Sequence, residues 1–230
     1  ARVPLLEMHL GGLASVAAAV VSQLGGRAAF IGCAGQDGFG DYVVGAMAAR
    51  GVDVGQVRRT SEESTSATVV LIGEDGERTF LHHVGANRLL KESDVDLDFV
   101  ARARILHWAG PSATPGLDGA PIARVLEQAR ARGVKTSVDT CFDATGAWLP
   151  LMEAALPHLD IVMTSFEEAR HYTGQDDPEA MADFFRGYGV ETVLVKLGAE
   201  GLFVKGTSGT HALPAHPVEV VDTTGAGDAA

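Results

Sequence analysis

The sequence predicts an α/β protein with a mostly parallel sheet and a small, separate β hairpin. Along most of the chain, short apolar runs alternate with helical patterns of about 10 to 15 residues, which is the order of βαβ units. One pair of β-rich runs has no helix between its members and therefore predicts a hairpin outside the main sheet. Hydrophobic residues make up 46% of the 230 residues, which is enough for one large domain with a small appendage.

The first elements that we expect are a helix, a strand and a second helix. Residues 12–24 are rich in alanine and valine and predict a buried helix. Residues 27–32 (RAAFIG) predict a short buried strand. Residues 39–50 predict a helix that ends at Gly51.

The hairpin consists of two β-rich runs, residues 66–72 and 78–84, on either side of the turn residues 73–76 (GEDG). Two strands alone are marginally stable, so we expect further strands from residues 2–10. Such a unit would act as a lid that keeps water away from a bound substrate. The expected division of the chain is into a β lid, residues 1–11 and 58–88, and an α/β core, residues 12–57 and 89–230.

Four later apolar runs predict the strands of the main sheet: residues 105–109, 136–139, 161–164 and 192–196. A helical pattern over residues 122–132 lies between the first two. Ligands of parallel α/β folds bind beyond the carboxyl ends of the strands. That rule directs attention to Gly110, Asp139, Thr164, Ser165, Gly198 and the segment after Val221.

Charge and motif content exclude several classes of protein. The chain has 18 basic and 30 acidic residues, a net charge of −12, so we expect neither nucleic acid nor an anionic membrane surface as a partner. No apolar run approaches the roughly 20 residues of a membrane helix. Cys33 and Cys141 have no metal-ligand spacing, and a cytoplasmic location is expected. No P-loop motif occurs and no GxGxxG follows the first strand, which disfavours a P-loop kinase and a Rossmann dehydrogenase.

Residues 220–228 (VVDTTGAGD) carry the most informative pattern. The small side chains of Gly225, Ala226 and Gly227 let a phosphate approach the backbone N–H groups, and a helix beginning there would add its own free N–H groups. Asp228 would repel a bound phosphate, so it is better placed as a general base for an attacking hydroxyl. The structural alternative is a glycine-rich turn with an aspartate in the first turn of a helix.

The string DTTGAGDA at 222–229 resembles the second signature of ribokinase-like (phosphofructokinase B) carbohydrate kinases. The resemblance covers nearly the whole chain. Residues 11–26 look like the first signature region, and residues 32–40 look like the G-x-x-G-x-D-x-x-G stretch of the family. The resemblance implies a three-layer α/β/α core with a mostly parallel sheet, a small β lid, and a kinase that uses ATP and Mg²⁺.

Carried over residue by residue, the resemblance makes Asp228 the general base, and it makes Gly225, Ala226 and Gly227 the anion hole for the transferring phosphoryl group. The residues that it places along ATP are Ser165, Lys196, Gly198, Glu200, Gly201, Thr223 and Thr224. Lys196 replaces a threonine of the family's T-L-G-x-x-G pattern. Its ammonium group could reach a phosphate, but a lysine at a strand end could equally extend into solvent.

The resemblance also implies cation sites. Glu168 and Asp139 would organise Mg²⁺ through water, because hard cations prefer oxygen ligands. Ser165 and Glu168 have the spacing of a capping box as well, and Asp139 could simply cap a loop, so both interpretations stay open. Asp222 and Thr224 match positions that hold a monovalent cation, K⁺, in ribokinase, although many relatives lack that dependence.

On the sugar side, the resemblance places Gly11 and Gly12 near sugar hydroxyls. Val16 stands where the family has an asparagine that binds a hydroxyl, so that contact is lost or supplied elsewhere. Asn87 and Gly110 are the other residues expected at the sugar, with a turn asparagine as the alternative for Asn87. His82 and His83 point to opposite faces of their strand and receive no role.

The function expected is ATP-dependent phosphorylation of a sugar hydroxyl on a hexose, ketohexose, pentose or sugar acid. A nucleoside kinase of the adenosine type is the alternative within the class. A non-catalytic sugar- or nucleotide-binding relative is a second alternative, which Val16 favours and the intact GAGD disfavours. The resemblance further implies a homodimer formed through the lids. Because the pattern of the family continues past Asp228, we expect the C-terminal part of the core to be missing.

Overall fold

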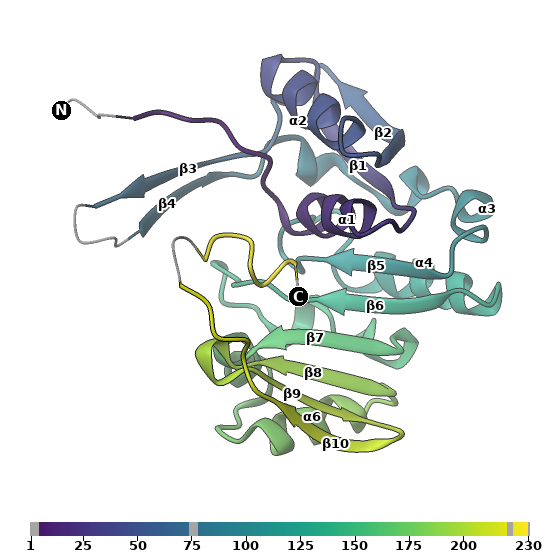
Figure 1. Cartoon of the computed structure of the whole chain (residues 1–230). Coiled ribbons are helices and arrows are strands. Elements are labelled where there is room, and N and C mark those ends of the chain that lie inside the picture. The colour runs from purple at the N-terminus through teal and green to yellow at the C-terminus, as the bar shows by residue number, and fades with distance from the viewer. Residues whose placement is uncertain (1–4, 74–77, 220–222, 230) are drawn as a thin grey trace.

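The computed structural model describes residues 5–73, 78–219 and 223–229. Its main sheet has six strands in the order β10-β9-β8-β7-β6-β5 (Figure 1). The strands are β5 (Ile105–Ala109), β6 (Lys135–Asp139), β7 (Ile161–Ser165), β8 (Thr192–Lys196), β9 (Leu202–Gly206) and β10 (Gly209–Leu213). β5 to β8 are parallel, whereas β9 and β10 add two antiparallel strands at one edge. The predicted α/β class with a mostly parallel sheet is confirmed.

The N-terminal part of the chain forms a second, two-stranded parallel sheet from β1 (Ala29–Gly35) and β2 (Asp53–Thr60). Two helices pack nearby, α1 (Leu13–Gln23) and α2 (Gly38–Ala48). The carboxylate of Asp37 begins α2 by accepting a hydrogen bond of 2.7 Å from the Gly40 amide, which is the usual work of a helix N-cap. β2 was not predicted, and it runs across the expected boundary between residues 57 and 58.

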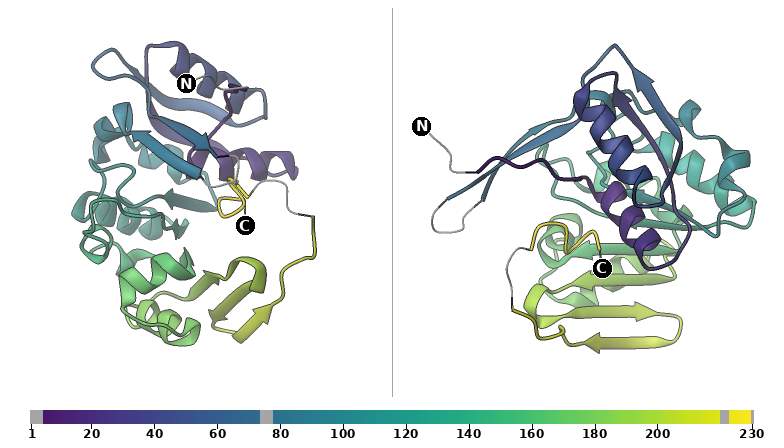
Figure 2. Two further views of the ribbon diagram at one scale, coloured as in Figure 1. Left: turned by 90° about the vertical axis from the view of Figure 1, so that its left-hand side faces the viewer. Right: turned by 45° about the horizontal axis from the view of Figure 1, so that its top comes forward.

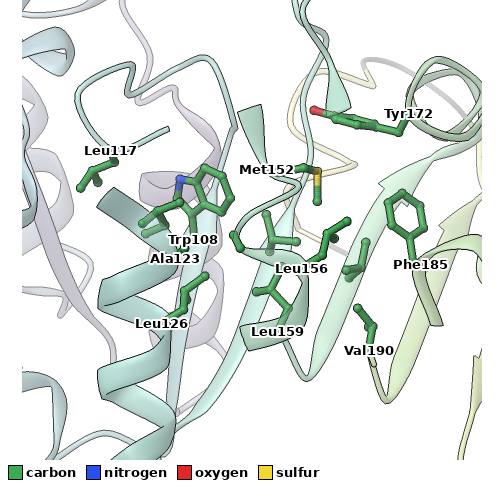
Figure 3. Close-up of a cluster of buried hydrophobic side chains, with 14 of the residues drawn as sticks. Trp108, Leu117, Ala123, Leu126, Met152, Leu156, Leu159, Tyr172, Phe185 and Val190 are labelled. Carbon is green, nitrogen blue, oxygen red and sulfur yellow. The ribbon is translucent and has the colours of Figure 1, made fainter. Parts of the chain in front are cut away.

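The remaining helices are α3 (Leu97–Val100), α4 (Ala120–Ala131), α5 (Phe166–Thr173) and α6 (Pro178–Arg186). Short 3₁₀ turns connect them: η1 (Gly85–Leu89), η2 (Glu92–Asp94), η3 (Leu149–Leu151), η4 (Leu156–His158) and η5 (Gly198–Glu200). The largest core cluster lies between these helices and the six-stranded sheet (Figure 3). Leu126 of α4 and Phe185 of α6 are fully buried there. Trp108 at the end of β5 is 5% exposed and belongs to this core.

The predicted hairpin forms from β3 (Ala67–Ile72) and β4 (Arg78–His83), which pair with each other and with no other strand of the described residues. Figures 1 and 2 show that it projects from the body as a separate arm. The structure differs from the expectation at residues 5–11, which have no regular secondary structure and add no strand to the hairpin. Most of the predicted turn lies outside the described residues.

The fold brings several candidate site segments to one edge of the main sheet. The carboxyl ends of β5 to β8 point toward the same side of the molecule, where the hairpin and the C-terminal loop also lie (Figure 1). In the described part of the chain, no helix has the length and apolar character that crossing a lipid bilayer requires.

Candidate active site

The C-terminal loop, residues 223–229, makes a compact turn. The Ala226 amide donates to the Thr223 carbonyl and the Ala229 amide donates to the Gly225 carbonyl, both at 3.1 Å. The second of these bonds has the spacing of a first helical turn. Gly225 has φ = 79°, a left-handed conformation that glycine adopts without steric cost. The turn itself therefore favours a glycine at position 225.

Lys196 at the end of β8 contacts this loop and a buried carboxylate together. Its Nζ lies 2.7 and 2.9 Å from the two carboxylate oxygens of Asp139 and 3.1 Å from the carbonyl oxygen of Gly227. The side chain of Asp139 is 3% exposed and that of Lys196 is 16% exposed. The structure therefore brings together three residues that the sequence analysis had assigned to catalysis, nucleotide and metal.

Two carboxyl groups of this site, those of Asp139 and Asp228, have pKa values above the ordinary value of an aspartate. Burial raises the pKa of Asp139 to about 6, although Lys196 acts in the opposite direction. Burial also raises the pKa of half-buried Asp228, again against the effect of Lys196 and with a further increase from Glu168. Removing a carboxylate from water disfavours its charged form. A raised pKa suits a group that must accept a proton near neutral pH.

Glu168 lies beside the same edge, on α5. Its Oε2 accepts 2.6 Å from the Thr140 hydroxyl, and a reciprocal pair of 3.3 Å bonds with Ser165 forms a capping box. The structural interpretation of the Ser165 and Glu168 pattern is therefore confirmed. The negative charge of Glu168 also contributes to the raised pKa of Asp139 and to that of Asp228.

The first turn of α1 packs directly on the C-terminal loop. A Cβ placed on Gly225 would lie 3.7 Å from Cγ1 of Val16. The hydroxyl of buried Ser15 donates to the carbonyls of Gly11 and Gly12 at 2.5 and 2.8 Å. Val16, which stands where the pattern of the family has a polar residue, therefore lies beside the loop at Gly225.

The other two residues predicted to bind the sugar are Gly110 and Asn87. The Gly110 amide donates to the Asp139 carbonyl at 2.9 Å, and Leu13 of α1 lies close to Gly110. Asn87 is part of η1, where its carbonyl accepts from the Leu90 amide. No hydrogen bond of its side chain to residues 223–229 occurs within the described chain.

The predicted nucleotide loop after β8 is held by a close backbone approach. A Cβ on Gly201 would lie 2.0 Å from the carbonyl oxygen of Leu213, so only glycine fits there. The Leu197 amide donates to the Gly201 carbonyl at 2.8 Å and closes the loop around Gly198 and Glu200. Asp222, predicted to bind a monovalent cation, lies outside the described residues.

Sequence reasoning missed Arg78, at the tip of the hairpin. Its guanidinium group donates to the hydroxyls of Thr224 and Thr223 at 2.8 and 3.1 Å. The hairpin thus touches the C-terminal loop directly in front of Gly225. The signal available in the sequence was an arginine directly after the hairpin turn, and it could not be interpreted because its partners lie 145 residues or more away.

The sequence was compared with protein families and with known proteins, and it matches carbohydrate kinases. The sequence model of the family described as pfkB family carbohydrate kinase matches residues 1–230. The chain is 30% identical over 240 residues to fructokinase-1 of Oryza sativa subsp. japonica, covering 100% of this chain and 73% of the relative. It is 29% identical over 227 residues to the ribokinase of Haemophilus influenzae, covering 96% of this chain and 72% of the relative.

Solved structures show the same fold. A ribokinase II of E. coli, solved in complex with ATP and Mg²⁺, superposes with a TM-score of 0.82 at 26% identity. The match covers 100% of this chain and 77% of that one. The edge that carries Asp139, Lys196 and the C-terminal loop is therefore set in a fold that elsewhere holds Mg²⁺ and ATP.

Proposed function

The chain belongs to the pfkB family of carbohydrate kinases, and within that family we propose that it transfers the γ-phosphoryl group of ATP to a hydroxyl of a sugar. The observation that carries the proposal is the half-buried carboxyl group of Asp228, which directly follows the turn of Gly225, Ala226 and Gly227. A base, an anion site and a cation at Lys196 thereby occupy one edge of the sheet.

Asp228 is the proposed general base. A sugar hydroxyl is a weak nucleophile, and a carboxylate within hydrogen-bond reach can take its proton as the oxygen attacks phosphorus. The backbone N–H groups of Gly225, Ala226 and Gly227 form the proposed anion hole for charge on the transferring group. We propose that ATP lies along Ser165, Thr223, Thr224 and the loop of Lys196, Gly198, Glu200 and Gly201.

Asp139 and Glu168 fit the requirements of a Mg²⁺ ion that arrives with ATP. Within the described chain, no group of three or more His, Cys, Asp or Glu side chains could hold a metal alone. Mg²⁺ does not need such a group, because it keeps several waters and binds one or two carboxylates together with phosphate oxygens. When bound, the ion would neutralise charge on the β- and γ-phosphate oxygens.

We expect Glu168→Gln to raise the Mg²⁺ concentration needed for half-maximal activity by about tenfold or more, as loss of a supporting carboxylate commonly does. The KM for sugar should change much less. Titration of the initial rate with Mg²⁺ measures this effect, and Glu167→Gln on the exposed side of α5 is the matched control. If only the melting temperature of Glu168→Gln falls, Glu168 serves the capping box alone.

A monovalent cation at Asp222 and Thr224 is a further part of the proposal, supported by the DTTGAGD motif. K⁺ beside the loop would add to its positive potential. The hydroxyl of Thr224 already accepts a hydrogen bond from Arg78, so a cation site and the lid would share one residue.

The sugar is proposed to lie between the hairpin and the first turn of α1, near Gly11, Gly12, Val16, Asn87 and Gly110. The experiment that tests the proposed function is a panel of hexoses, ketohexoses, ribose, sugar acids and nucleosides, each assayed for ATP consumption and for phosphorylated product. Product formation from one sugar supports the proposal. ATP hydrolysis without phosphorylated product, or phosphorylation of adenosine alone, would contradict it.

We propose that the hairpin is a lid and that two lids pack together in a homodimer. One face of the hairpin carries Arg78, whose contact with the C-terminal loop orients that face toward the site. Strand alternation then turns Val69, Leu71 and Leu81 to the opposite face, where they are 53%, 48% and 57% exposed. A two-stranded sheet with a wet apolar face is marginally stable, and a second copy would cover it.

Sedimentation of the protein at micromolar concentration should therefore show a dimer. Leu81→Asp should convert it to a monomer, because a charge on the buried face of the interface would lose its hydration. Leu24→Asp, a change of another exposed leucine, is the control and should leave the dimer intact. A wild-type monomer whose hairpin amides exchange freely even with sugar bound would rule out both the dimer and the lid.

A cytoplasmic location is the last part of the proposal. Cys33 and Cys141 are both free thiols, as is usual in a reducing compartment, and the proposed reaction consumes ATP.

A further inference from the structure

The most unusual group in the site is the ammonium of Lys196. It donates to three acceptors at the proposed catalytic edge: both carboxylate oxygens of Asp139 and the carbonyl oxygen of Gly227. An ammonium group has three donors and no acceptor, so these contacts satisfy it fully. Basic side chains are the minority in this protein, with 18 against 30 acidic residues. A lysine ammonium held against the C-terminal loop is therefore a distinctive feature of the site.

A contribution to folding stability does not explain why Lys196 and Asp139 form an ion pair at this edge. Asp139 ends β6 and Lys196 ends β8, so their side chains reach each other across the end of β7, which lies between them in the sheet. Burying a carboxylate and an ammonium costs desolvation free energy that their attraction often fails to recover. An apolar pair could join the two strands at lower cost. The pair also occupies a carboxylate that we have proposed for Mg²⁺.

We propose that Lys196 is a catalytic cation that pairs with Asp139 and moves to the transferring phosphoryl group when Mg²⁺ and ATP bind. The inference rests on the proposed function. In this exchange Asp139 turns from the ammonium group to the hydrated metal, and Lys196 turns from the carboxylate to the phosphoryl oxygens. No covalent bond changes, and each charge leaves one partner of opposite sign for another.

The geometry requires only a small movement. The Nζ of Lys196 already lies 3.1 Å from the Gly227 carbonyl, and a Cβ on Gly227 would be 3.7 Å from it. Lysine has a flexible four-carbon stem that carries a compact point charge, so a change of rotamer can redirect the ammonium. The proximity of Lys196 also lowers the pKa of Asp228, in opposition to burial, so its charge already acts on the proposed base.

Charge on the equatorial oxygens of the phosphoryl group must be stabilised during transfer, and preorganised cations serve that purpose. A cation used in this way contributes more to the transition state than to the ground state. The inference therefore separates Lys196 from an ordinary ligand of ATP, whose removal would weaken nucleotide binding and transition-state binding alike.

Lys196→Met tests the inference, with Lys205→Met as the matched control. Lys205 lies on β9 and pairs with Glu179 and Asp183, away from the site. We expect Lys196→Met to lower kcat by about 10²-fold or more, with the KM for sugar within about twofold. Calorimetric binding of Mg·ADP with aluminium fluoride and sugar, which imitates the transition state, should weaken by a similar factor, whereas Mg·ADP alone should bind with little change or more tightly.

Chemical rescue provides a second measurement. Lys196→Ala should regain part of its turnover when ethylammonium is added, because the small cation can occupy the place of the lost ammonium, whereas Asp228→Asn should not. If Mg·ADP and the aluminium fluoride complex weaken equally in Lys196→Met, the residue is a ground-state ligand and the inference is wrong. If Lys196→Met turns over normally while Asp228→Asn is inactive, the ion pair is structural and the proposed function still stands. Inactivity of every variant and of the wild type on all sugars would instead contradict the proposed function.

Discussion

Replacing Asp228 by Asn is expected to lower kcat by about 10²-fold or more, the usual contribution of a general base. Asparagine keeps the shape of the side chain but cannot accept the proton of the attacking hydroxyl. Binding of ATP should be roughly retained, because the nucleotide contacts proposed for the backbone turn and for the loop after β8 are unchanged. Initial rates with saturating sugar and calorimetric titration with ATP measure the two effects separately.

The control for this variant is Asp183→Asn on α6, which removes an exposed carboxylate paired with Lys205 and should leave kcat unchanged. The pH dependence offers an independent check. A base works when deprotonated, and burial raises the pKa of Asp228, so kcat/KM of the wild type should fall as the pH decreases through a value above the ordinary 3.8 of an aspartate. Near wild-type turnover in Asp228→Asn would refute the assignment of the base.

Gly225→Ala is expected to lower kcat by about 10²-fold, because a displacement of roughly 1 Å in groups that position the reaction has an effect of that size. Gly225 has φ = 79°, where an L-residue costs about 1–2 kcal/mol. The added methyl would lie at an ordinary van der Waals distance of 3.7 Å from Val16, so the strain is that of the backbone. The loop should relieve this strain by moving, so that its N–H groups no longer converge on the phosphoryl group.

Gly133→Ala is the matched control for the loop. Gly133 has φ = 80° between α4 and β6, with no atom within 4 Å of the Cβ position, so it has the same backbone strain at the amino end of the sheet. Both variants should lose similar amounts of unfolding free energy in urea titrations, but only Gly225→Ala should lose kcat. Equal losses of kcat would mean that general destabilisation, and not the geometry of the anion hole, explains the effect.

The successful sequence predictions concern features that local patterns encode. The strands β5 to β8 lie within one residue of the predicted runs, because buried parallel strands are short, continuous apolar segments. The strands that were missed carry weaker patterns. β2 is rich in polar residues (DVGQVRRT), β9 has only three apolar residues in a row (LFVKG), and β10 is exposed along its length, so none of the three shows a long apolar run of the kind on which the prediction depended.

In the candidate site, too, the residues of a local motif were predictable, whereas their distant partners were not. The motif at 222–229 identified the family and the proposed base from residues that are neighbours in the sequence. The partners of those residues were not predictable from it. Arg78 contacts Thr224 across 146 positions, and Lys196 contacts Asp139 across 57. Strand order decides which distant side chains meet at one edge, and nothing in a local pattern specifies that order.

By itself, then, the sequence determined the alternation of strands and helices, the separate hairpin and the motif on which the proposed role of Asp228 rests, because each depends on residues within about one turn, strand or helix of one another. Only the tertiary structure decided that Val16 lies beside Gly225, that the hairpin reaches the loop through Arg78, and that Lys196 pairs with Asp139. The physical reason is that these contacts depend on how β6, β7 and β8 are ordered in the sheet and on where the hairpin projects. Both are consequences of packing the whole chain around one core.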